Sequence, residues 1–200
     1  MKRHAPATLR NRTFILDVLR RVLQGRREIL EIASGSGEHA VYLAGELPHL
    51  RWHPTDPDPD SLLSIEAHRA ESALHNVLPA ARLDVTQPVW GLSNIDAVVC
   101  INMIHIAPWA AAEGLFRGAA ALLPAGAPLY LYGPFRFAGV FTAPSNEAFD
   151  ASLRERNPAW GVRDLDDVTA LAESCGFARE EVIPMPANNH SVIFRRVIVA

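Results

Sequence analysis

The sequence predicts an α/β fold in which a mostly parallel sheet is covered by helices on both faces. Strand-like and helix-like segments alternate from residue 9 to the end of the chain, which is typical of parallel sheets with crossover helices. The segment RREILEIASGSGEHA, from Arg26, contains an apolar strand, a small-residue loop and the start of a helix. The chain closes with two strand-like segments joined by PANNH, a pattern that predicts an antiparallel hairpin.

Each element is predicted from its own periodicity and end signals. Apolar residues at helical spacing predict helices over Leu9–Leu23, His39–Glu46, Leu62–Ala73, Glu113–Leu123 and Val168–Ser174, with an exposed helix over Asn146–Arg156 as one interpretation of that segment. Seven strands are expected, over Glu28–Ala33, Arg51–Thr55, Ala81–Asp84, Ile95–Ile101, Leu129–Tyr132, Glu181–Met185 and Ser191–Val199. The almost wholly apolar fourth strand is typical of the centre of a parallel sheet.

Length and composition predict a single globular domain over residues 1–200. The formal net charge of -3 argues against general nucleic-acid binding, because surfaces that bind the phosphate backbone are usually basic. Only two cysteines occur, Cys100 and Cys175, so neither a disulfide framework nor a cysteine metal site is expected, and no other metal site is predicted. We found neither a secretory signal nor an uncharged run typical of a membrane span. A cytoplasmic location is therefore expected.

The glycine loop fits two classes of nucleotide cofactor. Gly35, Gly37 and Ala40 satisfy G-x-G-x-x-A, a pattern of nicotinamide and flavin enzymes that also arises often by chance. Glu31 lies four residues before Gly35 and completes E-x-x-x-G-x-G, which resembles the first motif of class I S-adenosylmethionine-dependent methyltransferases. A carboxylate in a buried strand needs a partner. In enzymes with this motif it lies near the positively charged methionine end of the cofactor. Gly35, Ser36 and Gly37 are therefore expected to contact the cofactor through their main-chain groups.

The ends of the other parallel strands supply further candidate ligands, because ligands of open α/β sheets bind at the carboxyl ends of the strands. Asp56 follows Gly37 by nineteen positions, the spacing of an acid that accepts hydrogen bonds from both ribose hydroxyls. Asp58 and Asp60 compete for this role. Asp84 is expected either to bind the adenine amino group or to cap a turn. Asn102 and Met103, after the fourth strand, are expected to hold the amino-acid end and to flank the adenosine.

The methyl acceptor is expected on the opposite rim. His105 is the candidate catalytic residue, since a histidine can transfer protons near neutrality, although a histidine in this position is more often structural. The long segment 134–164 is interpreted as a lid or acceptor-side insertion, and the N-terminal helix within residues 1–25 is expected over the cofactor side. The candidate acceptor-binding residues are Trp109, Tyr132, Asn146, Trp160 and Arg163.

Several long motifs resemble one protein family. EIASGSGEH, INMIHIAPW, LYGPF, SNEAFDASLRERNPAWGVRD and MPANNHSVIFRR are similar to sequences of the methyltransferase-like family whose animal members are called methyltransferase-like 26, over roughly Pro6 to Arg196. The resemblance implies a Rossmann-like class I methyltransferase fold, with a seven-stranded mixed sheet whose seventh strand inserts antiparallel beside the sixth. It also implies an S-adenosylmethionine site, and it implies no substrate.

The predicted function is S-adenosylmethionine-dependent methyl transfer to an acceptor of unknown identity, expected to be a small molecule. Two alternatives stay open: a nicotinamide-dependent oxidoreductase, which the G-x-G-x-x-A match allows, and a non-catalytic S-adenosylmethionine-binding protein. Neither a nucleic acid nor a membrane is expected as a partner. The oligomeric state is not predicted.

Overall fold

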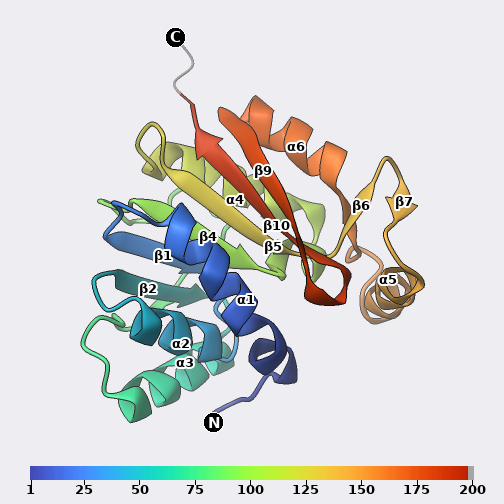
Figure 1. Cartoon of the computed structure of the whole chain (residues 1–200). Helices are drawn as coiled ribbons and strands as arrows, with labels where there is room; N and C mark the ends of the chain where they lie inside the picture. Colours follow the sequence, from blue (N-terminus) through green and yellow to red (C-terminus); the bar gives the residue numbers. More distant parts are fainter. Residues whose placement is uncertain (198–200) are drawn as a thin grey trace.

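The structure, a computed structural model of the chain, describes residues 1–197. Its main sheet has seven strands: β1 (Glu28–Ile32), β2 (Arg51–Asp56), β3 (Ala81–Arg82), β4 (Ala97–Ile101), β5 (Pro128–Gly133), β9 (Phe177–Met185) and β10 (Asn189–Arg196). They lie in the order β3-β2-β1-β4-β5-β10-β9 (Figure 1). The first five strands are parallel, and β10 is antiparallel to both β5 and β9. The predicted mixed sheet with an antiparallel C-terminal hairpin is confirmed.

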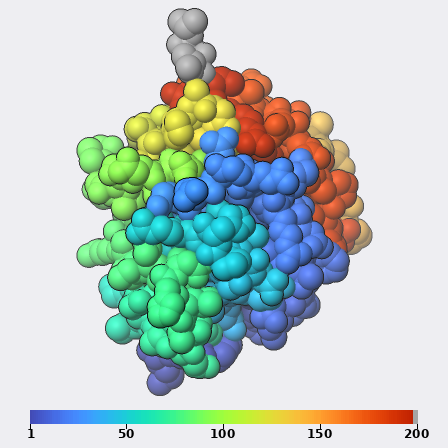
Figure 2. Space-filling model, turned by 60° about the vertical axis from the view of Figure 1, so that its left-hand side comes forward, coloured from blue at the N-terminus to red at the C-terminus, as the bar shows by residue number. Residues whose placement is uncertain are grey.

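Helices cover both faces of this sheet, which also confirms the prediction. Along β4, Val98 and Cys100 face a core completed by α4 (Trp109–Leu122) and α6 (Leu165–Ser174). Ala97, Val99 and Ile101 face the opposite core, which α1 (Pro6–Val22) and α2 (Glu38–Glu46) complete. Successive strand residues point to opposite faces, so a strand buried on both sides has to be apolar throughout. Figure 2 shows α1 in blue between α2 and the red C-terminal hairpin.

Several helices begin earlier than expected, because a proline or a polar capping residue lies at their N-termini. Both α1 and α3 (Pro59–Ser72) carry proline in their first turn, where its missing N–H costs no hydrogen bond. Asp58 caps α3 and accepts hydrogen bonds from the main-chain N–H groups of Asp60 and Ser61. Asp164 caps α6 in the same way. The start of α4 at Trp109, rather than Glu113, follows Pro108.

The strands differ from prediction mainly at their ends. Only two residues of β3 pair with β2, so Leu83 and Asp84 already belong to the following loop. Strand β9 begins at Phe177, four residues earlier than expected, and pairs along its whole length with β10. The last predicted strand was expected to reach Val199. It ends at Arg196, and Ile198 and Val199 lie outside the described residues.

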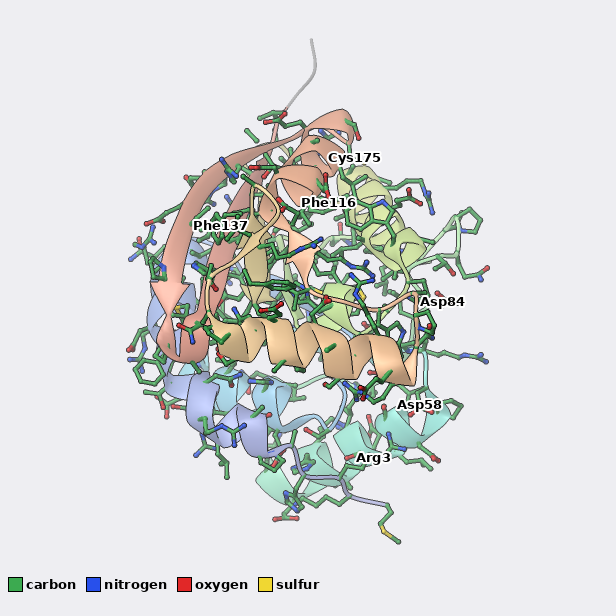
Figure 3. All side chains as sticks on the ribbon, turned by 90° about the vertical axis from the view of Figure 1, so that its right-hand side faces the viewer. Arg3, Asp58, Asp84, Phe116, Phe137 and Cys175 are labelled. Carbon is green, nitrogen blue, oxygen red and sulfur yellow. The ribbon has the colours of Figure 1, made fainter. Side chains whose placement is uncertain are left out.

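Residues 134–164 form a separate layer at the carboxyl edge of the main sheet. They contain β6 (Phe135–Phe137), β7 (Val140–Phe141), α5 (Pro144–Arg156) and β8 (Arg163–Asp164), and the three strands form a small second sheet that the sequence did not predict. The helix considered over Asn146–Arg156 is present as α5. In Figure 3, α5 crosses in front of the carboxyl edge, with Phe137 above it and Asp58 below. The insertion therefore lies where ligands of such sheets bind.

Candidate functional site

The loop between β1 and α2 has the backbone shape that its glycines allow. Gly35 and Gly37 both have positive φ, 59° and 90°, in the left-handed region that favours glycine. A Cβ on Gly37 would lie 2.7 Å from the Cα of Ile65 in α3. Gly37 therefore lets α2 begin directly against α3, and no other residue fits at this position without movement of one helix.

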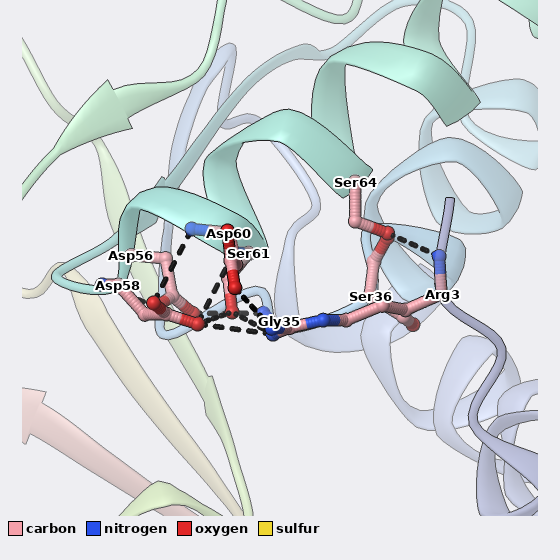
Figure 4. Close-up of polar contacts among 8 residues, drawn as sticks. All are labelled: Arg3, Gly35, Ser36, Asp56, Asp58, Asp60, Ser61 and Ser64. Atoms are coloured by element: carbon pink, nitrogen blue, oxygen red, sulfur yellow. Dashed lines mark hydrogen bonds and ion pairs between the residues drawn. The ribbon is translucent and has the colours of Figure 1, made fainter. Parts of the chain in front are cut away.

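Asp56, the last residue of β2, connects this loop to the second strand. Its Oδ2 accepts a hydrogen bond from the main-chain N–H of Gly35 at 2.9 Å, and its Oδ1 accepts one from Asp58 at the same distance (Figure 4). Burial raises the pKa of the Asp56 carboxyl group, and both hydrogen bonds oppose that rise. The competing residues have other roles, since Asp58 caps α3 and Asp60 forms an exposed ion pair with Arg3. Of the three acids, only Asp56 faces the neighbouring cavity.

That cavity, which we call the donor cavity, lies at the carboxyl ends of β1, β2 and β4. Its volume is about 420 Å³. Four of the eight predicted cofactor residues line it: Gly35, Asp56, Asp84 and Met103. Apolar side chains form most of the remaining wall, notably Ile32, Leu83, Val85, Ile106 and Ala111. The cavity is therefore an apolar slot with two carboxyl groups at its rim.

Asp84 has the turn-closing role that was one of the two considered for it. Its Oδ1 accepts hydrogen bonds from the main-chain N–H of Thr86 at 2.9 Å and from the Thr86 hydroxyl at 2.7 Å. These bonds hold the pKa of the carboxyl group below its usual range. Asp84 thus closes a turn and also lines the donor cavity.

Glu31 lies in the buried strand that the sequence predicted, but it does not line the donor cavity. It is buried within β1 and accepts a hydrogen bond from the indole N–H of Trp52 at 2.8 Å. It faces the same side of the sheet as Ile29, whereas Ile32 points to the side that lines the donor cavity. Burial raises the pKa of Glu31 to about 7, although the Trp52 and Ser34 side chains donate hydrogen bonds to it. Its partners belong to the sheet, so contact with the positive end of a cofactor is not supported.

Ser36 and Gly37 shape the loop without lining the donor cavity. The Ser36 hydroxyl donates to Glu38 at 3.1 Å, and the Ser36 carbonyl accepts from the Ser64 hydroxyl at 2.8 Å. Ser64 in turn accepts a hydrogen bond from the main-chain N–H of Arg3 (Figure 4). These contacts fix the outer side of the loop against α3 and the N-terminal segment.

A second cavity, the asparagine cavity, adjoins the donor cavity at Ile106, which lines both. Its volume is about 560 Å³, and its polar wall is formed by Arg10, Asn11, Asn102, Tyr132, Ser145, Asn146, Asn188 and Asn189. Three predicted site residues meet here: Asn102 after β4, Tyr132 in β5 and Asn146 in α5. Asn146 donates to the Thr142 hydroxyl at 2.8 Å and to the Asn188 carbonyl at 2.9 Å. The insertion and the C-terminal hairpin are thereby joined at this cavity.

Sequence reasoning missed several residues on these walls. Asn188 follows Ala187, and both have positive φ in the turn of the terminal hairpin. The repeated asparagine of PANNH is the signal that could have identified this turn, because asparagine tolerates that conformation. Ile106 carried no such signal. It lies in an apolar run whose preceding isoleucine, Ile104, belongs to the core.

His105 is not placed for acid-base chemistry. It is fully buried, and its Nδ1 accepts a hydrogen bond from the main-chain N–H of Arg163 at 3.2 Å. Its ring packs edge-on against Phe135, with centroids 4.9 Å apart, and it lines neither of the two cavities. Burial lowers its pKa to about 3, and the positive charge of Arg163 adds to this effect. A catalytic role for His105 does not fit this geometry, because a buried neutral ring cannot reach an acceptor.

The remaining acceptor candidates lie apart from the asparagine cavity. Trp109 and Arg163 line a third cavity, together with Arg136 and Arg154. The Trp160 ring stacks against the Arg156 guanidinium at 5.5 Å and lines none of the three cavities. A role for Trp160 in acceptor binding is thus not supported.

No helix among residues 1–197 combines the length and the apolar character that crossing a membrane requires.

Solved structures of methyltransferases share this fold. An O-methyltransferase family protein from Burkholderia thailandensis superposes with a TM-score of 0.81 at 15% identity, over 97% of this chain and 58% of that one. The S-adenosylmethionine-dependent methyltransferase SibL gives 0.80 at 18% identity, over 96% and 56%. The mitomycin 7-O-methyltransferase MmcR gives 0.80 at 16%, over 96% and 54%. This chain therefore spans little more than half the length of these proteins.

At such low identity, these likenesses establish a Rossmann-like methyltransferase fold and leave the activity to be tested. They do not test the resemblance to the methyltransferase-like 26 type, which stays a prediction. A single family match covers nearly the whole chain, over residues 2–196. The chain belongs to the family described as "Protein of unknown function (DUF938)".

Proposed function

We propose that this chain is an S-adenosylmethionine-dependent methyltransferase that binds the methyl donor in the donor cavity. The observation that carries the proposal is the Asp56 carboxylate, fixed at the end of β2 by the N–H of Gly35 beside an apolar slot. In this assignment Asp56 accepts hydrogen bonds from the ribose hydroxyls and Asp84 from the adenine amino group. Leu83, Met103 and Ala111 pack against the adenine ring. The bound donor supplies an electrophilic methyl group on a positively charged sulfur.

The charge of the donor cavity fits this cofactor. Asp56 and Asp84 line it, and none of its described lining residues is cationic. S-adenosylmethionine carries positive charge on its sulfonium and ammonium groups, so two carboxylates favour it. The pyrophosphate of a dinucleotide would meet repulsion instead.

The backbone of the glycine loop also disfavours a dinucleotide. The N–H of Gly35 donates to Asp56, that of Gly37 donates to the Ser34 carbonyl at 3.0 Å, and that of Glu38 to the Ser36 hydroxyl. Dinucleotide sites present such N–H groups to the pyrophosphate. Since these three already have acceptors within the chain, we place the nicotinamide-dependent alternative second.

We place the methyl acceptor, a small molecule, in the asparagine cavity beyond Ile106. Asn102, Tyr132 and Asn146 would orient its polar groups, and α5 would close the cavity as a lid. Among the described residues, no carboxylate or histidine lines this cavity. Methyl transfer from a sulfonium depends mainly on alignment of the nucleophile with the methyl carbon. The proposed acceptor is therefore a nucleophile that attacks without a basic side chain of the protein, such as a neutral amine or a thiolate.

Calorimetry with S-adenosylmethionine and S-adenosylhomocysteine tests the donor assignment. Both should bind the wild type, and Asp56→Ala should weaken binding by roughly 1.5 to 3 kcal/mol, because charged hydrogen bonds to the ribose are lost. Asp60→Ala is the matched control, since Asp60 lies four residues after Asp56, in the first turn of α3, and outside the donor cavity. Circular dichroism would verify that each variant is folded.

Three outcomes would count against parts of the proposal. If neither compound binds folded wild-type protein, the donor assignment is wrong. If Asp56→Ala binds as tightly as wild type, the ribose partner lies elsewhere. If the donor binds but no methyl group is transferred across a screen of cell-extract metabolites, the non-catalytic alternative is favoured.

A further inference from the structure

The third cavity, which we call the arginine cavity, lies outside the proposed donor and acceptor sites. It has a volume of about 490 Å³ and is lined by Trp109, Arg136, Arg154, Val162, Arg163, Asp164, Asp167, Ala170 and Leu171. Its three arginines come from three different elements, β6, α5 and β8. Three guanidinium groups that converge on one cavity repel one another unless an anion balances them.

Two of these arginines have no acidic partner in the part of the chain that the structure describes. Within residues 1–197, no carboxylate oxygen lies within 4.0 Å of a guanidinium nitrogen of Arg136 or Arg163, and only Arg154 is paired, with Asp150 at 2.7 Å. The Nε of Arg136 is buried without any hydrogen-bond partner among the described residues. A buried donor is costly when left unpaired, so a hydrogen-bond acceptor beside Arg136 would be favoured in this cavity.

Arg163 is held in place by the main chain. Its Nε donates to the Ile104 carbonyl at 2.9 Å, and its Nη2 donates to the carbonyls of Ala107 and Ala159. These carbonyls leave Nη1 without a partner in the described structure and fix the plane of the guanidinium group. The pKa of Arg163 is lowered, first by burial and then by the positive charge of Arg154, with a further contribution from Arg136.

Among residues 1–197, the two acids on the cavity wall, Asp164 and Asp167, form no ion pair with Arg136 or Arg163. Asp164 uses both carboxylate oxygens on main-chain N–H groups, Oδ2 with Gly139 at 2.6 Å and Oδ1 with Asp166 at 3.0 Å. Asp167 is exposed at the rim. Both carboxylates nevertheless lie close enough to weaken the binding of a doubly charged anion. A singly charged anion thus fits the cavity better than a phosphate.

We propose that the arginine cavity binds the carboxylate of a small organic acid. One carboxylate oxygen would accept a hydrogen bond from Nη1 of Arg163 and the other from Arg136. Trp109, Val162 and Leu171 would contact the apolar body of the same molecule. The proposed site does not depend on the donor assignment, because none of its lining residues lines the donor cavity.

Titration with sodium benzoate at low ionic strength, followed by saturation-transfer NMR, tests the site without any cofactor. We expect saturable binding that Arg136→Gln weakens by about tenfold or more, since one charged hydrogen-bond partner is lost. Arg117→Gln is the matched control, because Arg117 is exposed on α4 and its substitution also removes one positive charge. Asp167→Asn should tighten binding, because it removes a negative charge from the rim.

Arg136→Gln should weaken benzoate binding and Asp167→Asn should tighten it, so the test holds even if Arg136→Gln is poorly folded. The proposal is overturned if benzoate fails to saturate, if Arg136→Gln and Arg117→Gln bind alike, or if Asp167→Asn weakens binding. Tighter binding of inorganic phosphate than of benzoate would also overturn it. Saturating S-adenosylhomocysteine should leave the benzoate signal in place, and competition between them would contradict separate sites.

Discussion

The buried Glu31 carboxyl group makes stability depend on pH. Burial raises its pKa from 4.5 to about 7 in the folded chain. The folded state therefore binds more protons than the unfolded state between these values. The stabilisation of the folded state by the neutral Glu31 carboxyl group is complete below about pH 4.5 and is lost as the pH rises to about 7. The loss amounts to about 3 kcal/mol at most, from the size of this pKa shift.

Glu31→Gln should abolish this dependence, because glutamine is neutral and still offers an oxygen to Trp52. The free energy of unfolding of the variant, minus that of wild type, should be larger at pH 7.5 than at pH 5, as measured by urea denaturation at both values. Glu113→Gln, at an exposed position of α4, serves as the control. A constant difference between Glu31→Gln and wild type at both pH values would show that Glu31 is ionised throughout.

The His105 ring should stay neutral over the pH range in which a histidine that acts as an acid-base catalyst would titrate. Burial lowers its pKa to about 3, so stability from the neutral ring is complete above about pH 6.5 and is lost only as the pH falls towards 3. Because Nδ1 accepts from Arg163, the proton resides on Nε2. Imidazole ¹⁵N spectra should show this neutral tautomer unchanged from pH 8 to pH 5. A signal of His105 that titrates near pH 6 would restore it as a catalytic candidate.

The sequence predicted a residue's position best where spacing along the chain determines it. Asp56 lies beside the donor cavity as expected, because one helix and one strand separate it from Gly37 by a nearly fixed length, and its role in binding stays a prediction. The motif of Glu31 shows where it stands in the strand but not which face it takes, so its separation from the donor cavity was not predicted. The burial of His105 depends on Phe135 and Arg163, which are distant in sequence, so no local pattern could reveal it.

At the scale of elements, the junction of the loop with α2 and α3 depends on Gly37. Gly37→Ala should destabilise the protein by about 3 kcal/mol, since the new Cβ adds both backbone strain and overlap with Ile65. Gly91→Ala separates these causes, because Gly91 has a similar positive φ and no atom within 4 Å of the added Cβ. Chemical denaturation should show a distinctly smaller loss for Gly91→Ala. Equal losses would mean that backbone strain alone requires Gly37.

The length of an element decided whether the sequence could predict it. Six strands of the main sheet and the helices on its faces were expected, because each repeats an apolar pattern long enough to recognise. β3 was also expected, although only Ala81 and Arg82 pair with β2. Two-residue strands such as β7 and β8 carry no such pattern. The small sheet exists because β6 pairs with both of them. Such pairing is a tertiary property, and therefore the insertion was predicted as a region without its architecture.

At the scale of the whole molecule, the proposed functional surface crosses the carboxyl edge of the sheet from β2 to β10. The donor cavity lies on one side of Ile106, and the asparagine cavity lies on the other, under α5 and the terminal hairpin. Residues from α1 and from the hairpin, 177 positions apart at Asn11 and Asn188, share the second wall. The cavity thus depends on the completed fold, which explains why strand ends alone predicted the donor half better than the acceptor half.

Ile106 should control the passage between the two cavities. Its side chain is 42% exposed, so Ile106→Trp should leave the unfolding temperature of the free protein nearly unchanged while its indole occupies space in both cavities. At a concentration of 100 times the dissociation constant, S-adenosylhomocysteine should stabilise wild type by about 2.7 kcal/mol, and most of this gain should vanish in the variant. Leu63→Trp, on the exposed side of α3, should retain it. If Ile106→Trp keeps the full ligand-induced stabilisation, the donor does not reach the junction, and the two cavities act separately.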